Sequence, residues 1–318
     1  MLAVGQLILR RVVATVPVLF LVTLGVFLLI HLVPGDPIEA MMGESQDEAA
    51  KQALREELGF DKPLIVQYAT WGGHLLQGDL GRSVRTRAPV LEDVGRRIRP
   101  SLELAVFAML ISLTISIPMG ILSATHKNTS IDSLGTSFAL FGICMPNFVL
   151  ALLLIFVFGV RLRWLPIASF VDPFDDPING IRSLALPAIT LGLALAAVIT
   201  RTLRSSLLET LTEDYVRTAR AKGLMESAII RSHALKNALI PVITVLGLQF
   251  GTLIGGAVIT EYVFALPGVG RLVVDAVFAR DYPLVQGVVL LVALGFIASN
   301  LLVDVAYGWL DPRIRYSG

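Results

Sequence analysis

The chain has 318 residues, of which 55% are hydrophobic and 16% are charged, and its formal net charge is +1. With a mean hydropathy of +0.75, this composition exceeds what the core of a soluble protein of this size requires, so the sequence indicates an integral membrane protein. The single cysteine, Cys144, excludes an intrachain disulfide and a thiolate metal cluster.

Apolar runs of the length of a membrane-spanning helix occur six times along the chain. They cover about residues 12–33, 102–124, 136–160, 184–203, 241–260 and 284–303. The expected fold is therefore all-α, with six transmembrane helices and both termini on one side. Pro118, Pro146 and Pro187 fall within these runs and predict kinks.

The first run follows Arg10 and Arg11, as the apolar part of a signal peptide would. It is too long for that role, and it leads into Pro-Gly-Asp-Pro at 34–37 rather than into a small-residue cleavage site. We therefore expect residues 1–33 to be the N-terminus and a retained first transmembrane helix.

Residues 34–101 are the one long polar segment outside the expected spans, and residues 102–318 form a core of five transmembrane helices. Within 34–101, the stretch from Ser45 to Leu58 is rich in Ala, Glu, Gln and Lys, which predicts a surface helix. Gly72-Gly73 and the Gly-Asp-Leu-Gly stretch at 78–81 predict turns. Arg96, Arg97 and Arg99 precede the second span and are expected to snorkel or to pair with lipid phosphates.

Orientation follows from the basic residues. With the N-terminus in the cytoplasm, twelve Lys and Arg residues fall on the cytoplasmic side and five in the short outer loops, while nine lie in 34–101. The balance predicts cytoplasmic termini, an extracytoplasmic segment 34–101 and a cytoplasmic loop 207–240 between the fourth and fifth spans.

The loop 207–240 is unusually charged for a connection between two apolar spans. We expect two short helices in it, with Gly223 between them in the left-handed conformation. Glu213 and Asp214 would lie in the first turn, with Glu213 four residues before Arg217, and Thr210 or Thr212 would cap it. Pro241 is expected in the first turn of the next helix. A solvated helical hairpin, with Gly223 serving only as a cap, is the alternative.

Catalytic motifs are absent from the sequence. The four histidines are scattered without an HExxH pattern, no Gly-Lys pair forms a P-loop, and Gly268-Val-Gly270 lacks the third glycine of a dinucleotide site. If the protein's work requires ATP, another chain must bind it.

Four polar residues lie in or near the expected spans, where burial is costly and often tied to function. Asn300 and Asp304 are expected to be structural. Asn147 and Gln249 lie deeper, and we expect them to face a translocation pathway, since a peptide backbone requires neutral donors and acceptors.

The stretch from Tyr215 to Gly223, followed by His233-Ala-Leu-Lys-Asn-Ala and Pro241, resembles the cytoplasmic EAA loop of ABC importer permeases. The closest resemblance is to the first permease of dipeptide and oligopeptide (peptide/nickel) importers. Similar motifs occur at 34–37, 78–83, 89–90, 163–166, 261–270, 280–283, 300–304 and 311–313, so the resemblance spans nearly the whole chain. Arg217 stands where the acidic residue of the loop is expected, and Thr218 replaces its first alanine.

The resemblance implies a coupling helix that sits in a cleft of a cytosolic ATPase and drives alternating access. Its implied contact residues are Tyr215, Arg217, Ala219, Arg220, Lys222 and Gly223, with Ala219 allowing close approach and Gly223 the turn. The implied partners are a second homologous permease, two ATPase domains, an extracytoplasmic peptide-binding protein and membrane lipid, without nucleic acid. The chain itself would be no enzyme and would hold no cofactor, since ATP-Mg belongs to the ATPases, and it would lie in a cytoplasmic (inner) membrane of bacterial or archaeal type.

Three other functions are alternatives for this sequence. A nickel or other small-solute permease would share nearly all of these motifs. A secondary transporter would need ion-coupling carboxylates near the midplane, and an intramembrane enzyme would need a convergent catalytic pair. The central spans offer neither.

Overall fold

The computed structural model describes residues 2–32, 36–42, 47–57 and 59–310, and these are helical apart from loops and one β-bridge between Arg82 and Pro89. The helices, including two π-helical segments η1 and η2, are α1 (Leu2–Leu32), α2 (Pro37–Met42), α3 (Glu48–Glu57), α4 (Leu64–Leu76), α5 (Val90–Thr125), α6 (Ser130–Cys144), α7 (Asn147–Leu154), η1 (Ile155–Arg161), α8 (Pro177–Thr210), α9 (Asp214–Ala221), α10 (Glu226–Ala228), η2 (Ile229–Ala234), α11 (Leu235–Gly256), α12 (Val258–Val263), α13 (Val269–Phe278) and α14 (Tyr282–Leu310).

Within the described ranges, four helices are long and apolar enough to cross a membrane: α5, α8, the continuous stretch Glu226–Leu253 and Tyr282–Leu302 of α14. The pair formed by α6 and α7–η1 makes a fifth if it is counted as one span, and it is bent by 103°. In α1, the stretch Val13–Leu28 is apolar among the residues whose side chains are described. The all-α membrane fold is confirmed, while six spans remain a prediction.

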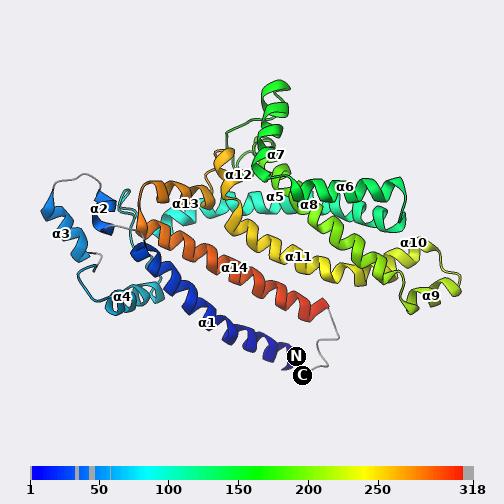
Figure 1. The fold of residues 1–318 in the computed structure, drawn as a ribbon, viewed down its shortest axis with the longest axis horizontal. Helices are drawn as coiled ribbons and strands as arrows, with labels where there is room; N and C mark the ends of the chain where they lie inside the picture. Colours follow the sequence, from blue (N-terminus) through cyan, green and yellow to red (C-terminus); the bar gives the residue numbers. More distant parts are fainter. Residues whose placement is uncertain (1, 33–35, 43–46, 58, 311–318) are drawn as a thin grey trace.

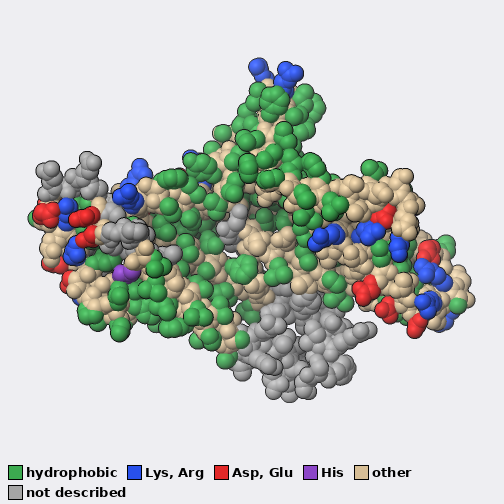
Figure 2. Space-filling model, viewed as in Figure 1, with side chains coloured by type: hydrophobic (Ala, Val, Ile, Leu, Met, Phe, Trp, Pro, Cys, Tyr) green, Lys and Arg blue, Asp and Glu red, His purple; other side chains and the backbone are tan. Residues whose placement is uncertain are grey.

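The long helices α1, α14, α11, α8 and α5 form an elongated bundle with broadly aligned axes, and the neighbouring helices α1 and α14 run in opposite directions (Figure 1). On the face in Figure 2, hydrophobic side chains cover much of the middle of the bundle, and charged side chains gather at its two ends and at the tip of the arm formed by α7 and η1. This division places the apolar middle in the hydrocarbon and the charged ends in water.

The centre of the bundle is the contact between α5 and α8, where Leu104, Leu191 and Ile199 are buried. Two glycines let these helices approach closely. A Cβ on Gly192 would lie 2.9 Å from the carbonyl oxygen of Ala108, and one on Gly120 would lie equally near the side chain of Leu203. A larger residue at either glycine would push the helices apart.

The predicted kinks differ in outcome. Pro146 stands at the N-terminus of α7, beside the 103° bend. Pro118 and Pro187 lie inside α5 and α8, which continue through them. The run 136–160 is divided at the kink predicted for Pro146, because the chain changes direction between Cys144 and Asn147.

The segment 34–101 holds α2, α3 and α4 at the end of the bundle opposite α9 (Figure 1). Helix α3 confirms a surface helix here; Ser45 and Leu58, the ends of the expected stretch, lie outside the described residues. The turn expected at Gly72-Gly73 is wrong, since both glycines lie inside α4. The turn at 78–81 is confirmed, with φ of +81° at Gly78 and at Gly81.

Helix α5 begins at Val90, well before the apolar run at 102, so Arg96, Arg97 and Arg99 lie within it rather than in front of it. Arg99 binds Glu103 (Nε to Oε1, 3.0 Å) and Asp172 (Nη2 to Oδ1, 2.9 Å). At this end of the bundle, Arg99 therefore joins α5 to the loop that precedes α8.

The loop after α4 is fastened to the turn before α14 by the buried carboxylate of Asp281. The hydroxyl of Ser83 donates a hydrogen bond to Asp281. The backbone N–H groups of Val84 (3.2 Å) and Arg85 (3.4 Å) also donate to this carboxylate. The carboxylate thus fixes two segments that lie almost 200 residues apart in the sequence.

Candidate functional site

The charged loop lies at the end of the bundle where α8 ends at Thr210, and it continues into α9 and then into α10, η2 and α11 (Figure 1). Gly223 ends α9 with φ of +77°, which confirms the left-handed turn predicted there. Its N–H donates to the carbonyl of Arg220 (2.9 Å), and the N–H of Leu224 donates to that of Ala219 (3.3 Å). These hydrogen bonds satisfy carbonyls at the end of α9.

The inner face of α9 packs on its own chain. Val216 and Ala219 are buried against Ile229 of η2, and Leu211 covers their edge. The small side chain of Ala219 thus permits α9 to approach η2 closely. Helix α9 is therefore attached to the segment that becomes α11 as well as to the end of α8.

Two details of the predicted loop are wrong. Thr210 and Thr212 do not cap α9, because their hydroxyls donate back to Ser206 (2.8 Å) and Glu209 (2.7 Å). Arg217 pairs with Asp214 at 3.4 Å rather than with Glu213, which occupies the N-cap position.

Pro241 does not start a helix either. The helix that contains it already runs from Glu226 through η2, so Pro241 falls in the interior of α11. The segment after the Gly223 turn is thus one long continuous helix.

An ion pair closes the turn at Gly223. The guanidinium of Arg220 donates to Glu226, with Nε 3.2 Å from Oε1 and 3.1 Å from Oε2. These hydrogen bonds with Glu226 raise the pKa of Arg220 above its ordinary value, so the pair stays charged. It joins the end of α9 to the start of α10 across the glycine.

The outer face of the loop is exposed and mixed in character. It carries Arg217, Lys222 and Tyr215, whose hydroxyl accepts a hydrogen bond from Asn237 (2.7 Å). Directly after Gly223 lie Leu224 and Met225, which are 44% and 74% exposed. Sequence reasoning missed these two, although a pair of apolar residues in a charged loop was the available signal. They form a small exposed apolar pair next to the charged side chains of the loop.

The two pathway candidates, Asn147 and Gln249, form no hydrogen bond with each other in the described part of the chain. Asn147 is exposed at the first position of α7, beside the bend. Gln249 is half-buried in α11, where the hydroxyl of Thr252 donates to its carbonyl oxygen (2.7 Å) and lies 3.4 Å from its Oε1. Of the expected structural pair, Asn300 has a buried Oδ1 without a hydrogen bond among the described residues, and the side chain of Asp304 lies outside them.

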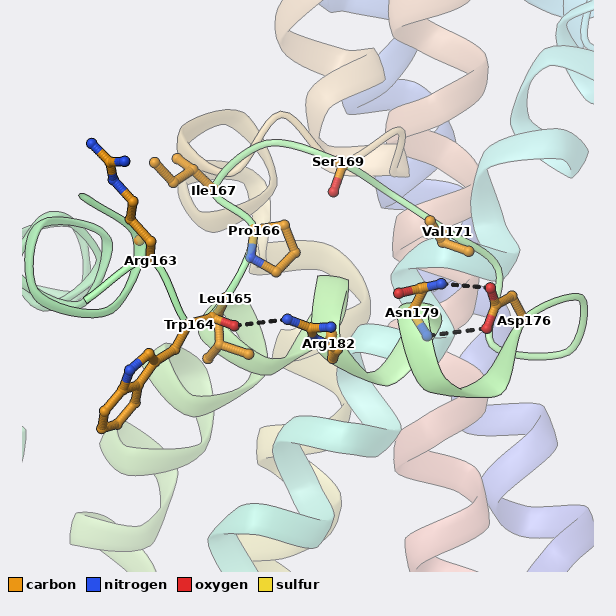
Figure 3. Close-up of a pocket in the computed structure, with 11 residues that line it drawn as sticks. Arg163, Trp164, Leu165, Pro166, Ile167, Ser169, Val171, Asp176, Asn179 and Arg182 are labelled. Atoms are coloured by element: carbon orange, nitrogen blue, oxygen red, sulfur yellow. Dashed lines mark hydrogen bonds between the residues drawn. The ribbon is translucent and has the colours of Figure 1, made fainter. Parts of the chain in front are cut away.

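A hollow of about 570 Å³ lies beside the loop between η1 and α8 (Figure 3). Its polar groups hold the loop in place. Arg182 donates to the carbonyl of Trp164 (3.0 Å), and Asp176 accepts from the backbone and side chain of Asn179 (3.1 and 2.6 Å). These bonds from Asn179 lower the pKa of Asp176. The described residues contain no group of three metal-ligating side chains.

Comparison with known proteins gives the family. Residues 116–316 match the family "Binding-protein-dependent transport system inner membrane component", and residues 4–105 match its N-terminal counterpart. The chain is 42% identical over 312 residues to the probable peptide ABC transporter permease protein y4tP of Sinorhizobium fredii, which covers 98% of this chain and 100% of the relative. It is 44% identical over 309 residues to the glutathione transport system permease protein GsiC of Salmonella typhimurium, with 97% and 98% covered.

The fold is also similar to that of a solved structure, an inward-facing form of the MetNI methionine ABC transporter. The TM-score is 0.51 at 20% identity, and the match covers 67% of this chain and 95% of that one. At this identity the likeness concerns the fold alone. The family matches and the nearly full-length relatives show that the chain belongs to the inner-membrane permease components of binding-protein-dependent transport systems.

Proposed function

We propose that this chain is a permease subunit of an ATP-driven ABC importer that moves di- or oligopeptides across the cytoplasmic membrane. The observation that carries the substrate class is the nearly full-length likeness to relatives named for peptide and glutathione transport. A nickel or other small-solute permease is the alternative. The subunit transports and does not itself hydrolyse ATP.

The loop around α9 is proposed to be the contact with a cytosolic ATPase. Its outer face offers cationic groups at Arg217 and Lys222 beside the apolar pair Leu224 and Met225. Its inner face is fixed to the chain through Val216 and Ala219. A protein that pushes on this outer face therefore displaces the ends of α8 and α11 together, which is the movement that alternating access requires.

The proposed assembly contains a second homologous permease, two ATPase domains that bind ATP-Mg, and an extracytoplasmic peptide-binding protein, all around a lipid-embedded core. The chain would lie in a bacterial- or archaeal-type inner membrane with both termini in the cytoplasm. The distribution of Lys and Arg supports this orientation. The segment 34–101, at the end opposite α9, would then face the binding protein.

Asn147 and Gln249 are proposed to face the pathway. Asn147 lies exposed where the α6–α7 span breaks, and the amide nitrogen of Gln249 donates no hydrogen bond to the described residues. A side-chain amide can both donate hydrogen bonds to a peptide backbone and accept them from it.

The substrate class is tested by transport. We expect the chain, reconstituted in vesicles with its neighbouring permease, ATPases and binding protein, to accumulate labelled tripeptide only when ATP is enclosed. ATPase subunits that bind but do not hydrolyse ATP are the control. Accumulation of nickel ions in place of peptide would reject the proposed substrate.

Orientation is tested with single cysteines in a Cys144→Ser background. A membrane-impermeant maleimide should label Ser227→Cys only from the cytoplasmic side and Asp61→Cys only from outside, because both positions are exposed and lie at opposite ends of the bundle. The reverse pattern at either cysteine would invert the proposed topology.

The Gly223 turn is tested with two substitutions. Gly223→Val places a β-branched residue at φ of +77°, so we expect at least about a tenfold loss of uptake through poor ATPase binding. Gly223→Asn tolerates this φ, and a Cβ meets nothing within 4 Å in the isolated chain. Loss of ATPase binding in the Asn variant therefore reports contact with the partner rather than strain.

The control for strain is Gly78→Val, since Gly78 has φ of +81° and equally open surroundings far from the loop. It should retain ATPase binding. Normal uptake by Gly223→Val would reduce Gly223 to a helix cap.

The pathway is tested with Asn147→Leu and Gln249→Leu. Each removes a neutral donor and acceptor, so peptide uptake should fall several-fold, while the amount of assembled complex and its ATP binding stay at the wild-type level. The double variant is measured in the same vesicles, and undiminished uptake by it would assign both amides to ordinary helix packing.

A further inference from the structure

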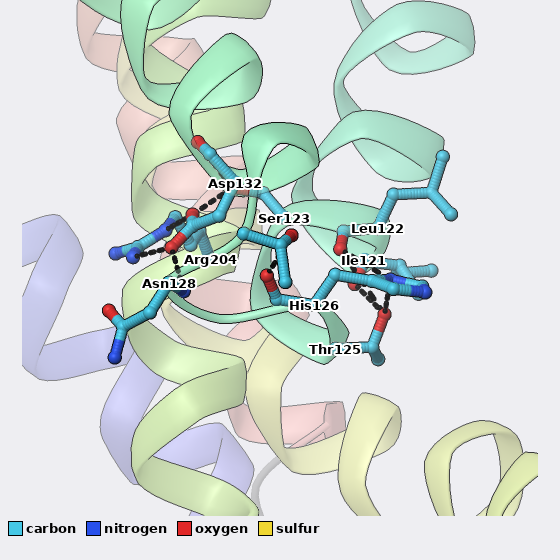
Figure 4. Close-up of polar contacts among 9 residues, drawn as sticks. Ile121, Leu122, Ser123, Thr125, His126, Asn128, Asp132 and Arg204 are labelled. Atoms are coloured by element: carbon cyan, nitrogen blue, oxygen red, sulfur yellow. Dashed lines mark hydrogen bonds and ion pairs between the residues drawn. The ribbon is translucent and has the colours of Figure 1, made fainter.

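A buried carboxylate joins three helices at the end of the bundle that carries α9. Arg204 of α8 donates to both oxygens of Asp132, with Nε 2.6 Å from Oδ1 and Nη2 2.7 Å from Oδ2. Ser123 of α5 donates its hydroxyl to Oδ1 (2.6 Å), and the N–H of Asn128 in the α5–α6 turn donates to Oδ2 (3.0 Å). We call these four residues the Asp132 clamp (Figure 4).

The ion pair of the clamp is largely buried, and it is held at two points. The side chain of Asp132 is 7% exposed and that of Arg204 is 25% exposed. A planar guanidinium bound to both oxygens of one carboxylate fixes the relative orientation of the two helices, which a single hydrogen bond does not. Removal of either partner leaves a charge with little access to water.

The clamp lies between the loop and the bend in the chain. Arg204 precedes the end of α8 by six residues, and α9 starts shortly after. Asp132 lies in the first turn of α6, whose other end at Cys144 meets the 103° bend before Asn147. Helix α6 thus connects the α9 end of the bundle to the bend.

Close packing extends the clamp along α6. A Cβ on Gly135 would lie 3.0 Å from the hydroxyl of Ser123, and one on Gly142 would lie 2.6 Å from the Cβ of Ala197. Helix α6 is therefore held to α5 near its start and to α8 at both ends. Such contacts leave little room for α6 to slide, and a tightly packed unit moves as one body.

We propose that the Asp132 clamp is a positioning element that makes α6 move with α8, so that a displacement of α9 reaches the bend at Asn147. The inference rests on the proposed function, because it assigns a path for the ATPase-driven movement inside this subunit. The clamp contacts neither substrate nor ATP. Without it, α8 would move while α6 and the bend lag behind.

The main test variant is Asp132→Leu/Arg204→Met, since replacing both members of a buried ion pair by apolar residues commonly preserves stability. In vesicles with the partner subunits, we expect near wild-type assembly and ATP hydrolysis, but at least about a tenfold lower uptake of labelled tripeptide per ATP hydrolysed. Ser123→Ala removes only one neutral donor and should stay within about twofold of wild type.

A second measurement separates transmission from stability. Spin labels at Leu140→Cys on α6 and Arg201→Cys on α8, both exposed, are placed in a Cys144→Ser background. The distance between them should be the same with and without ATP in the wild type and should change with ATP in the double variant. A merely structural clamp would leave this distance unchanged in every assembled complex.

Arg204→Lys covers the case in which the double variant does not assemble, since it keeps the charge but loses the two-point geometry. It should assemble and show a several-fold lower uptake per ATP. Full coupling in an assembled variant, with an unchanged α6–α8 distance, would overturn the clamp proposal. Absence of ATP-dependent tripeptide uptake by the wild type would instead reject the proposed function.

Discussion

Hydrogen bonding of buried carboxylates by other parts of the chain is the constraint on which this structure depends, because a buried carboxylate without such partners costs free energy. Asp132, Glu261 and Asp281 are all buried, and each accepts hydrogen bonds from a segment far away in the sequence. The carboxylates therefore act as fixed points at the ends of an apolar bundle. Between them, small residues rather than charges set how closely the helices pack.

Glu261 illustrates how such a point shapes the chain around it. Its Oε1 accepts from Ser101 of α5 (2.6 Å), and its Oε2 accepts from the N–H of Arg271 (3.1 Å). Ser101 in turn accepts from the N–H of Val269 (2.8 Å). Any Cβ on Gly268 would overlap the carboxylate, so this glycine is required for the turn to close over it. Burial raises the pKa of Glu261, an effect opposed by these hydrogen bonds.

These fixed points divide the molecule in a way that suits transport. Glu261 and Asp281 tie α12, α13 and the loop after α4 to the end opposite α9, while Asp132 ties α6 to α8 at the α9 end. The middle of the bundle has no comparable ion pair among the described residues. A bundle fixed at its ends and joined in the middle by apolar contacts can tilt without breaking a buried ion pair.

The sequence predicted those features that depend on neighbouring residues. Hydrophobic runs predicted the apolar helices, the family resemblance is confirmed, and a glycine after a cluster of basic residues predicted the left-handed turn at Gly223. The sequence did not predict features that depend on contacts between distant segments. Arg204 and Asp132 lie 72 residues apart, so nothing local identifies them as partners. The bend beside Pro146 was foreseen as a kink, but its size depends on how α7 packs against α8 and α12.

The exposed pair Leu224 and Met225 follows from the same reasoning. A loop that served only to connect two spans could satisfy its backbone and carry polar side chains throughout. Here the apolar residues of α9 and those of the turn after it lie on different sides of the loop. Val216 and Ala219 turn inward onto Ile229, whereas the left-handed turn at Gly223 directs the next two outward. The turn at Gly223 therefore separates two apolar side chains that pack within the chain from two that are exposed, and the exposed pair belongs to the contact with the ATPase proposed above.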